Sequence, residues 1–167
     1  ISVHGEVAPQ HILRRSGGLP GQRLAVTGAL GAAAACVRRG KLLPADSAAL
    51  TPLQRAYYRP HARFDVLAII MPATAGLDIS DGLSQDLGHL CAASGCGASL
   101  QSSSIPIAKG ATLEDALFGG DDYELLIASD EPLPGTYPIG VLTAELGLSL
   151  DSAPLAPKGF DHFGEER

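Results

Sequence analysis

Aromatic residues are scarce in this chain of 167 residues: phenylalanine, tyrosine and tryptophan together make up 5%, and tryptophan is absent. The core must therefore be built from Ala, Leu, Ile and Val, which favours packed layers of helix and sheet over an aromatic-rich sandwich. Basic residues are also in the minority, with 12 Lys and Arg against 18 Asp and Glu and a formal net charge of -6. This balance argues against a general nucleic-acid-binding protein, because contacts to phosphates need a basic surface.

Cysteines and long apolar runs are also few. The three cysteines, Cys36, Cys91 and Cys96, are an odd number without the two-residue spacing of a zinc knuckle, so we expect buried, reduced thiols. No segment of the sequence is apolar over the length of a membrane span. The first residues also lack the charged region followed by an apolar region that is typical of a signal peptide. We therefore expect a cytoplasmic protein without a membrane partner.

The length fits one domain with a sizeable core. Its 20 glycines and 12 prolines predict many tight turns rather than long uninterrupted helices. The sequence begins at Ile1 and already reads as a strand there. We interpret residues 1–167 as a single domain that forms the later part of a longer protein.

The stretch LDISDGLSQDL, residues 77–87, predicts a strand, a turn and a helix in succession. Apolar residues up to Ile79 favour a strand, Gly82 breaks the extended pattern, and leucines then recur at helical spacing. Asp86 and His89 fall on the polar side of that helix, where we expect them to be solvated.

Asp78 is expected at the carboxyl end of the strand and Asp81 at or next to the N-cap of the helix, with Ser80 between them. Two carboxylates at this junction suit Mg²⁺, which prefers hard oxygen ligands, while Ser80 and the helix N-terminus can meet phosphate oxygens. The same pattern also fits a simple helix cap. Acidic residues near a phosphorylated ligand imply that Mg²⁺ supplies the missing positive charge.

A second acidic stretch, GGDDYEL, begins at Gly119. A Gly-Gly pair followed by acids and then a strand brings backbone and carboxylates close to another group, most economically a ligand. The pattern fits equally well a hairpin entry whose acids are solvated. Near the end of the chain, Phe160 and Phe163 lie among glycine and charged residues, where they would either fasten the terminus or stack on a planar ligand.

The rest of the pattern predicts alternating strands and short helices. Between a strand and a helix, Gly28 and Gly31 favour close helix–sheet packing, because they complete neither a P-loop nor a Rossmann fingerprint. Further strands are expected at residues 1–7, 23–27, 97–100, 137–142 and 146–150, and helices at 32–39, 51–58, 61–71, 83–94 and 112–115.

DISDGL, GGDDYEL and KGFDHF, in this order, resemble the C-terminal half of the bacterial thiamine-monophosphate kinases, in the aminoimidazole-ribonucleotide-synthetase-like superfamily. HGEV, RRSG followed by PG, VTGALG and the Arg59-Pro60 pair extend this resemblance over essentially all 167 residues. It implies transfer of the γ-phosphoryl group of ATP to thiamine monophosphate with Mg²⁺, giving thiamine diphosphate. It also implies an α/β (α+β) C-terminal domain with a mixed sheet and packed helices, in a two-domain kinase that is a homodimer through an N-terminal domain outside this chain.

Residue by residue, the resemblance implies that Asp78 and Asp81 bind Mg²⁺ and that Ser80 contacts ATP. Asp121 and Phe160 match positions that hold the thiamine phosphate. No residue is assigned to proton transfer, because a phosphate-monoester oxygen is already largely ionised near neutral pH. The N-terminal motifs that the family uses for further metals are absent from this chain, so we expect the fragment alone to be inactive.

Two alternatives remain open. One is another ATP-dependent enzyme of the same superfamily with a different phosphorylated or amidated substrate, although GGDDYEL and GFDHF argue against it. The other is a non-catalytic module for ligand binding or assembly, which the absent N-terminal motifs keep in consideration.

Overall fold

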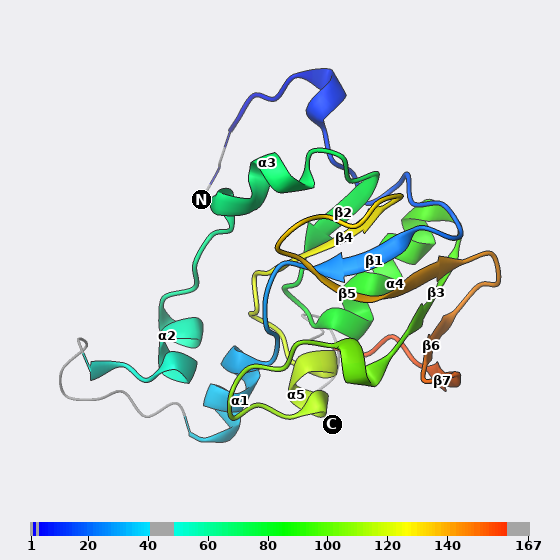
Figure 1. Cartoon of the computed structure of the whole chain (residues 1–167). Coiled ribbons are helices and arrows are strands. Elements are labelled where there is room, and N and C mark those ends of the chain that lie inside the picture. The colour runs from blue at the N-terminus through cyan, green and yellow to red at the C-terminus, as the bar shows by residue number, and fades with distance from the viewer. Residues whose placement is uncertain (1, 3, 41–48, 160–167) are drawn as a thin grey trace.

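A seven-stranded mixed sheet forms the centre of the computed structural model, which describes residue 2 and residues 4–40 and 49–159 (Figure 1). The strands are β1 (Arg23–Val26), β2 (Ala75–Asp78), β3 (Gly97–Leu100), β4 (Leu125–Ser129), β5 (Tyr137–Thr143), β6 (Leu148–Leu150) and β7 (Ala153–Leu155). Their order is β2-β4-β1-β5-β3-β6-β7, and among these pairs β3 and β6 run parallel while the others are antiparallel. The predicted α/β class with a mixed sheet is confirmed.

Short helices connect the strands. They are α1 (Ala32–Arg38), α2 (Pro52–Tyr58), α3 (Leu67–Ile70), α4 (Leu83–Ser94) and α5 (Leu113–Phe118), with 3-10 turns η1 (Pro9–His11), η3 (Phe64–Val66) and η4 (Ser102–Ser104). The predicted end of α4 is confirmed, because Gly95 adopts the left-handed conformation (φ 69°) that stops a helix. Among the described residues, none of these helices has the length and apolar character to cross a membrane.

The two faces of the sheet are covered by different elements. Leu24 of β1 and Leu126 of β4 belong to the larger core, to which α4 contributes its buried leucines. Ala25 and Ile127, one position further along each strand, belong to a second cluster on the other face with residues of η3 and α3. This alternation is the two-residue period of half-buried strands. Because α4 follows β2 along the chain, the carboxyl end of β2 lies next to the start of α4.

The core composition confirms the prediction from scarce aromatics. Its largest fully buried side chains are Leu, Ile and Val. Cys36, Cys91 and Cys96 are buried and free, as expected. Burial raises the pKa of the Cys91 thiol to about 12, so this group stays protonated and unreactive at neutral pH.

The prediction of a strand at residues 1–7 is wrong for the residues that the structure describes in this range, because residues 2 and 4–8 form no strand. Residues 1 and 3 lie outside the described residues. Val7 is exposed, so this segment lacks a buried face that would hold it on the sheet. The chain reaches the sheet edge only at Arg14, whose carbonyl accepts a hydrogen bond from the Gly76 N–H of β2 (2.9 Å).

The helix predicted for residues 61–71 is shorter, since η3 and α3 together span residues 64–70. Arg63 leaves the helical conformation (ψ 50°), and its guanidinium reaches the Thr27 carbonyl (2.8 Å) and the Glu124 carboxylate. Strand β6 begins two residues later than predicted, because Leu146 is 80% exposed in the turn.

Candidate functional site

Two acidic loops lie side by side at one end of the sheet: the first acidic loop, residues 78–82, and the second acidic loop, residues 119–124. The first follows β2 and begins α4, and the second leads from α5 into β4. Because β2 and β4 are antiparallel neighbours, the end of one strand meets the start of the other. Three backbone hydrogen bonds join the loops: from Asp121 N to Ser80 O (2.9 Å), from Tyr123 N to Ile79 O (2.8 Å) and from Ile79 N to Glu124 O (2.8 Å).

The Gly-Gly pair of the second acidic loop serves this contact. A Cβ atom on Gly120 would lie 2.5 Å from the Ser80 carbonyl oxygen, and one on Gly119 would clash with Ala34 of α1. Close approach to the protein itself therefore explains both glycines. Of the two interpretations of GGDDYEL, close approach of its backbone to another group is the one found, and for the glycines that group is the protein itself. Gly119, Gly120 and Asp121 also line a cavity, so contact with a ligand stays a prediction.

Asp86 organises the first acidic loop, and the prediction that it is solvated is wrong. It is 2% exposed, and its Oδ2 accepts hydrogen bonds from the backbone N–H groups of Ser80 (3.0 Å), Asp81 (2.9 Å) and Gly82 (3.2 Å). These three amides are therefore already bonded within the protein. The expected contact of Ser80 and the N-terminus of α4 with phosphate oxygens stays a prediction. The pKa of Asp86 is raised, chiefly because burial disfavours its charge, although the amides act in the opposite direction. His89 is exposed, as predicted.

The second acidic loop is held from within by Asp122. Its carboxylate accepts from the Gly31 N–H at the start of α1 (2.9 and 3.0 Å). Burial raises the pKa of Asp122 to about 7. Only the family resemblance singled out Asp121, and the residue pattern alone did not separate it from Asp122. A two-residue alternation is nevertheless present: residues 121 and 123 are exposed, and residues 122 and 124 are partly covered.

Glu124 forms the inner end of the same loop. Its carboxylate accepts from the Thr27 hydroxyl (2.6 Å) and pairs with Arg63, while that hydroxyl accepts from the Leu125 N–H (2.8 Å). Arg63 also pairs with the exposed Asp65 (3.0 Å). The pKa of Arg63 is raised, first because of its hydrogen bond to Asp65 and also because of Glu124. This network connects the loop to β1 and to the segment before α3.

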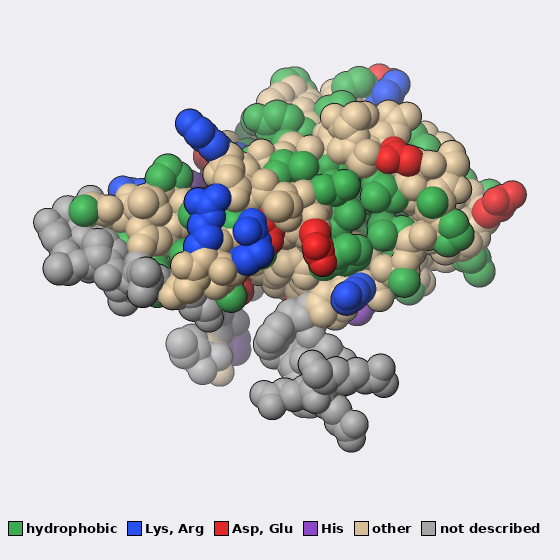
Figure 2. Space-filling model, turned by 90° about the horizontal axis from the view of Figure 1, so that it is seen from below, with side chains coloured by type: hydrophobic (Ala, Val, Ile, Leu, Met, Phe, Trp, Pro, Cys, Tyr) green, Lys and Arg blue, Asp and Glu red, His purple; other side chains and the backbone are tan. Residues whose placement is uncertain are grey.

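A cavity of about 730 Å³ lies between both acidic loops and helices α1 and α5. It brings together three of the predicted site residues, Ser80, Asp81 and Asp121, while Asp78 is exposed at the end of β2. Figure 2 views the molecule from below and shows Lys or Arg side chains beside Asp or Glu side chains on this face. The other lining residues are Ala33, Ala34, Val37, Arg38, Tyr57, Phe118, Gly119, Gly120, Tyr123 and Gly159.

The Tyr123 hydroxyl is influenced by three acids, which we call the outward acids: Asp78 and Asp81 of the first acidic loop and Asp121 of the second. It donates to Asp121 Oδ1 (2.9 Å), and this bond is the main cause of a raised Tyr123 pKa, followed by burial. The negative charges of Asp121, Asp78 and Asp81 raise the pKa further. Asp78, Asp81 and Asp121 therefore all act on the Tyr123 hydroxyl, and each offers the hard oxygen atoms that Mg²⁺ prefers.

The C-terminal segment returns to the same place. Ser84 of α4 donates to the Ala156 carbonyl (2.8 Å) and accepts from the Lys158 N–H (3.3 Å). Gly159 lies so close to the Asp81 carbonyl that a Cβ atom could not fit. Phe160, predicted to hold the substrate, lies outside the described residues.

Comparison with known proteins points to one group of enzymes. The chain is 33% identical over 191 aligned residues to the thiamine-monophosphate kinase of Salmonella typhimurium, covering 98% of this chain and 59% of that protein. It therefore spans about three fifths of the length of this protein and of the thiamine-monophosphate kinase of Escherichia coli K12, which it also matches at 33% identity.

Solved structures agree with this similarity. The thiamine-monophosphate kinase of Stenotrophomonas maltophilia K279a superposes with a TM-score of 0.76 at 29% identity, covering 89% of this chain and 56% of that one. A structure described as AaThiL complexed with AMPPCP and TMP superposes with a TM-score of 0.78 at 30% identity, covering 90% of this chain and 54% of that one.

The family model "AIR synthase related protein, C-terminal domain" matches residues 20–135. This range includes both acidic loops and every strand from β1 to β4. The chain therefore belongs to the AIR synthase related proteins, of which it contains the C-terminal domain.

Proposed function

We propose that this chain is the C-terminal domain of a thiamine-monophosphate kinase and supplies part of the site that transfers the γ-phosphoryl group of ATP to thiamine monophosphate. The observation that carries this proposal is the convergence of Ser80, Asp81 and Asp121 on one cavity of about 730 Å³. The similarity to thiamine-monophosphate kinases supports the substrate, and the AaThiL complex with AMPPCP, an analogue of ATP, supports the nucleotide.

The donor set of the first acidic loop fits Mg²⁺. Asp78 and Asp81 offer carboxylate oxygens, the ligands that this hard cation prefers, and Asp121 adds negative charge close by. When bound there, Mg²⁺ would neutralise phosphate charge during transfer. Asp78 and Asp81 are the residues that we propose would hold it, and the Ser80 hydroxyl would contact a nucleotide phosphate.

Asp121 is proposed to bind the thiamine phosphate. Its exposed carboxylate is held by the Tyr123 hydroxyl and lines the cavity, where it can pair with the cationic thiazolium ring of the substrate. Phe160 stays a prediction for stacking on the same substrate. The homodimer, the cytoplasmic location and the role as one domain of a longer kinase also stay predictions.

We further propose that a polypeptide of residues 1–167 does not catalyse by itself. Phosphoryl transfer requires that donor and acceptor phosphates are held in line while their charges are neutralised. The two acidic loops supply one carboxylate pair for a metal and one outward acid for the substrate, which makes half of such a site.

The test compares residues 1–167 with a fusion that places the N-terminal part of the Salmonella typhimurium kinase before residue 1. Formation of thiamine diphosphate is measured with ATP, Mg²⁺ and thiamine monophosphate. We expect background from the chain alone and turnover from the fusion. Thiamine, which lacks the phosphate, and ribose 5-phosphate, which lacks the rings, serve as control substrates.

Either of two results would contradict the proposal. Robust turnover by residues 1–167 alone would show that the acidic loops are not half of a site. A folded fusion that does not phosphorylate thiamine monophosphate would favour another substrate of the superfamily or a non-catalytic module.

A further inference from the structure

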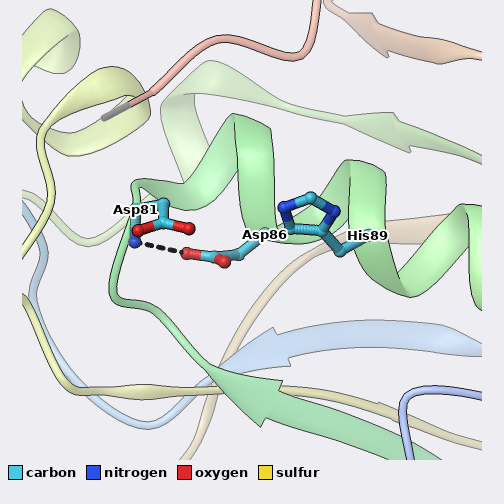
Figure 3. Close-up of side chains that lie close together, drawn as sticks. All are labelled: Asp81, Asp86 and His89. Atoms are coloured by element: carbon cyan, nitrogen blue, oxygen red, sulfur yellow. Dashed lines mark hydrogen bonds between the residues drawn. The ribbon is translucent and has the colours of Figure 1, made fainter. Parts of the chain in front are cut away.

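Asp86 is the most buried carboxylate near the acidic loops, although it belongs to the first turn of α4 rather than to a loop. Figure 3 shows its carboxylate directed at the backbone of Asp81. Building on the proposed function, we infer that Asp86 is a positioning residue: it fixes the backbone of the first acidic loop so that Ser80 and Asp81 face the cavity.

Three consecutive amides converge on the single Oδ2 atom of Asp86, at 3.0, 2.9 and 3.2 Å. Hydrogen bonds to an ionised acceptor are stronger than neutral ones, and three donors to one atom restrict the loop to one conformation. Without the carboxylate, three adjacent N–H groups turned toward the protein interior would lose their partner, which favours a different turn.

The same contact also orients the second acidic loop. With its N–H groups turned inward, the first acidic loop presents the Ser80 carbonyl outward, where it accepts from the Asp121 N–H (2.9 Å). Asp121 adopts a left-handed conformation (φ 64°), which is uncommon for a residue other than glycine and depends on such support. Asp86 thereby acts on the proposed metal ligand Asp81 and, through one further hydrogen bond, on the proposed substrate ligand.

Direct metal binding by Asp86 is the competing explanation. Asp81, Asp86 and His89 each place one ligand atom within 4.8 Å of the others. The geometry favours positioning, because Oδ2 of Asp86 already accepts three hydrogen bonds and His89 is exposed. The two explanations differ in what His89 and the metal-free protein should do.

The experiment uses residues 1–167 with Asp86→Asn, and Mn²⁺ as a paramagnetic probe for the Mg²⁺ site. In the metal-free variant, we expect the amide proton resonances of residues 80–82 to move upfield and their hydrogen exchange to accelerate about tenfold or more. Mn²⁺ affinity, measured by paramagnetic broadening, should fall about 10- to 100-fold, as is typical when a residue that orients a metal ligand is lost.

Asp151→Asn is the matched control. It removes the same charge and also a carboxylate that accepts from a backbone N–H, that of Ser102 (3.0 Å), but in the turn between β6 and β7. Its Mn²⁺ affinity should stay within about twofold of the unsubstituted chain, because charges far from the site are largely screened. Melting curves of both variants monitor the fold.

Several outcomes decide the inference. Unchanged resonances of residues 80–82 in Asp86→Asn would overturn it, as would a loss of Mn²⁺ affinity in His89→Ala equal to that in Asp86→Asn. If Asp86→Asn does not fold, hydrogen exchange of the unsubstituted, metal-free chain decides: amides 80–82 must be protected, and fast exchange there overturns the inference. If the unsubstituted chain binds no Mn²⁺ but the amides respond, the positioning role stands and the proposed metal site fails.

Discussion

The two acidic loops are stabilised in the same way, but their hydrogen-bond partners lie at very different distances along the sequence. In each, one acid turns inward and accepts from backbone N–H groups, and a nearby acid lines the cavity. For the first acidic loop the inward acid is Asp86 of α4, which accepts from amides four to six residues away. In the second, the inward acid Asp122 bonds Gly31, 91 residues away.

This difference separates a local motif from an assembled one. The first acidic loop needs only the start of α4, so its residues lie within one short stretch of sequence. The second acidic loop is completed by β1, by the segment before α3 and by α1, so it can form only when the sheet is in place. We therefore expect outward acids to control ligand binding directly. Inward acids should control the conformation that positions the outward acids and, most strongly in the second loop, the folding of the chain.

The largest effect is expected from an outward acid. In the fusion, Asp81→Asn should lower turnover by two or more orders of magnitude, because a lost metal ligand removes several kcal/mol of charge stabilisation, at about 1.4 kcal/mol per tenfold. The melting temperature should stay the same or rise, since Asp81 shares its surroundings with Asp78 and Asp121. Assays of thiamine diphosphate over a range of Mg²⁺ concentrations measure this. Full activity at low Mg²⁺ would show that Asp81 is not an outward ligand.

The next effect is a pH dependence from the inward acid of the second loop. The pKa of Asp122 rises from an ordinary 3.8 to about 7 on folding. Between these values the folded chain holds a proton that the unfolded chain has released, so this group stabilises the fold at acid pH and loses that stabilisation as pH rises through 7. Asp122→Asn removes the titration. Its stability relative to the unsubstituted chain should rise from pH 4 to pH 8, by up to about 4 kcal/mol.

Urea unfolding at several pH values measures this difference. Asp151→Asn is the control with the opposite sign, because hydrogen bonds from Ser102 hold the pKa of Asp151 below its usual value. Its cost should be present above pH 4 and diminish in more acid solution. A pH-independent difference between Asp122→Asn and the unsubstituted chain would mean that Asp122 does not titrate in this window.

The long-range network of the second loop should cost less to break. Arg63→Ala leaves Glu124 partly buried without its cation, and we expect a loss of about 2 kcal/mol in the free energy of unfolding. Asp65→Ala breaks the exposed pair of the same arginine and should cost clearly less, because solvent screens that pair. Adding Glu124→Gln to Arg63→Ala should recover part of the loss. Equal costs for Arg63→Ala and Asp65→Ala would place the stabilising contact at the surface.

The sequence predicted local features well. The apolar face of α4, its end at Gly95 and the start of α5 after Thr112 were all predictable, because each depends on residues within one or two helical turns. The pair of outward acids beside α4 was found for the same reason. Strand β7 was missed, because it is three residues long and is defined by its pairing with β6.

The inward acids could not be assigned from the sequence alone. Asp86 lies on the polar side of α4 by periodicity, yet it is buried because the first acidic loop folds back over it. The partners of Glu124 lie 97 and 61 residues away, at Thr27 and Arg63, where no local pattern connects them. Burial of Glu124 is therefore a result of the assembled sheet, and burial of Asp86 is a result of the local fold of the first acidic loop. Composition and spacing specify neither.

The smallest effect on stability is expected at Asp121, the direct neighbour of Asp122. Its carboxylate is exposed, and asparagine tolerates the left-handed conformation at this position (φ 64°) as well as aspartate does. Asp121→Asn should therefore change the free energy of unfolding by no more than about 0.5 kcal/mol at any pH between 4 and 8.

In the fusion, Asp121→Asn should still raise the KM for thiamine monophosphate about tenfold or more, because the ring cation loses its partner, while the KM for ATP stays nearly constant. Urea unfolding and initial rates on the same preparations measure both quantities. A pH-dependent stability in Asp121→Asn like that of Asp122→Asn, or an unchanged KM, would show that the two neighbouring acids do not divide folding and binding between them.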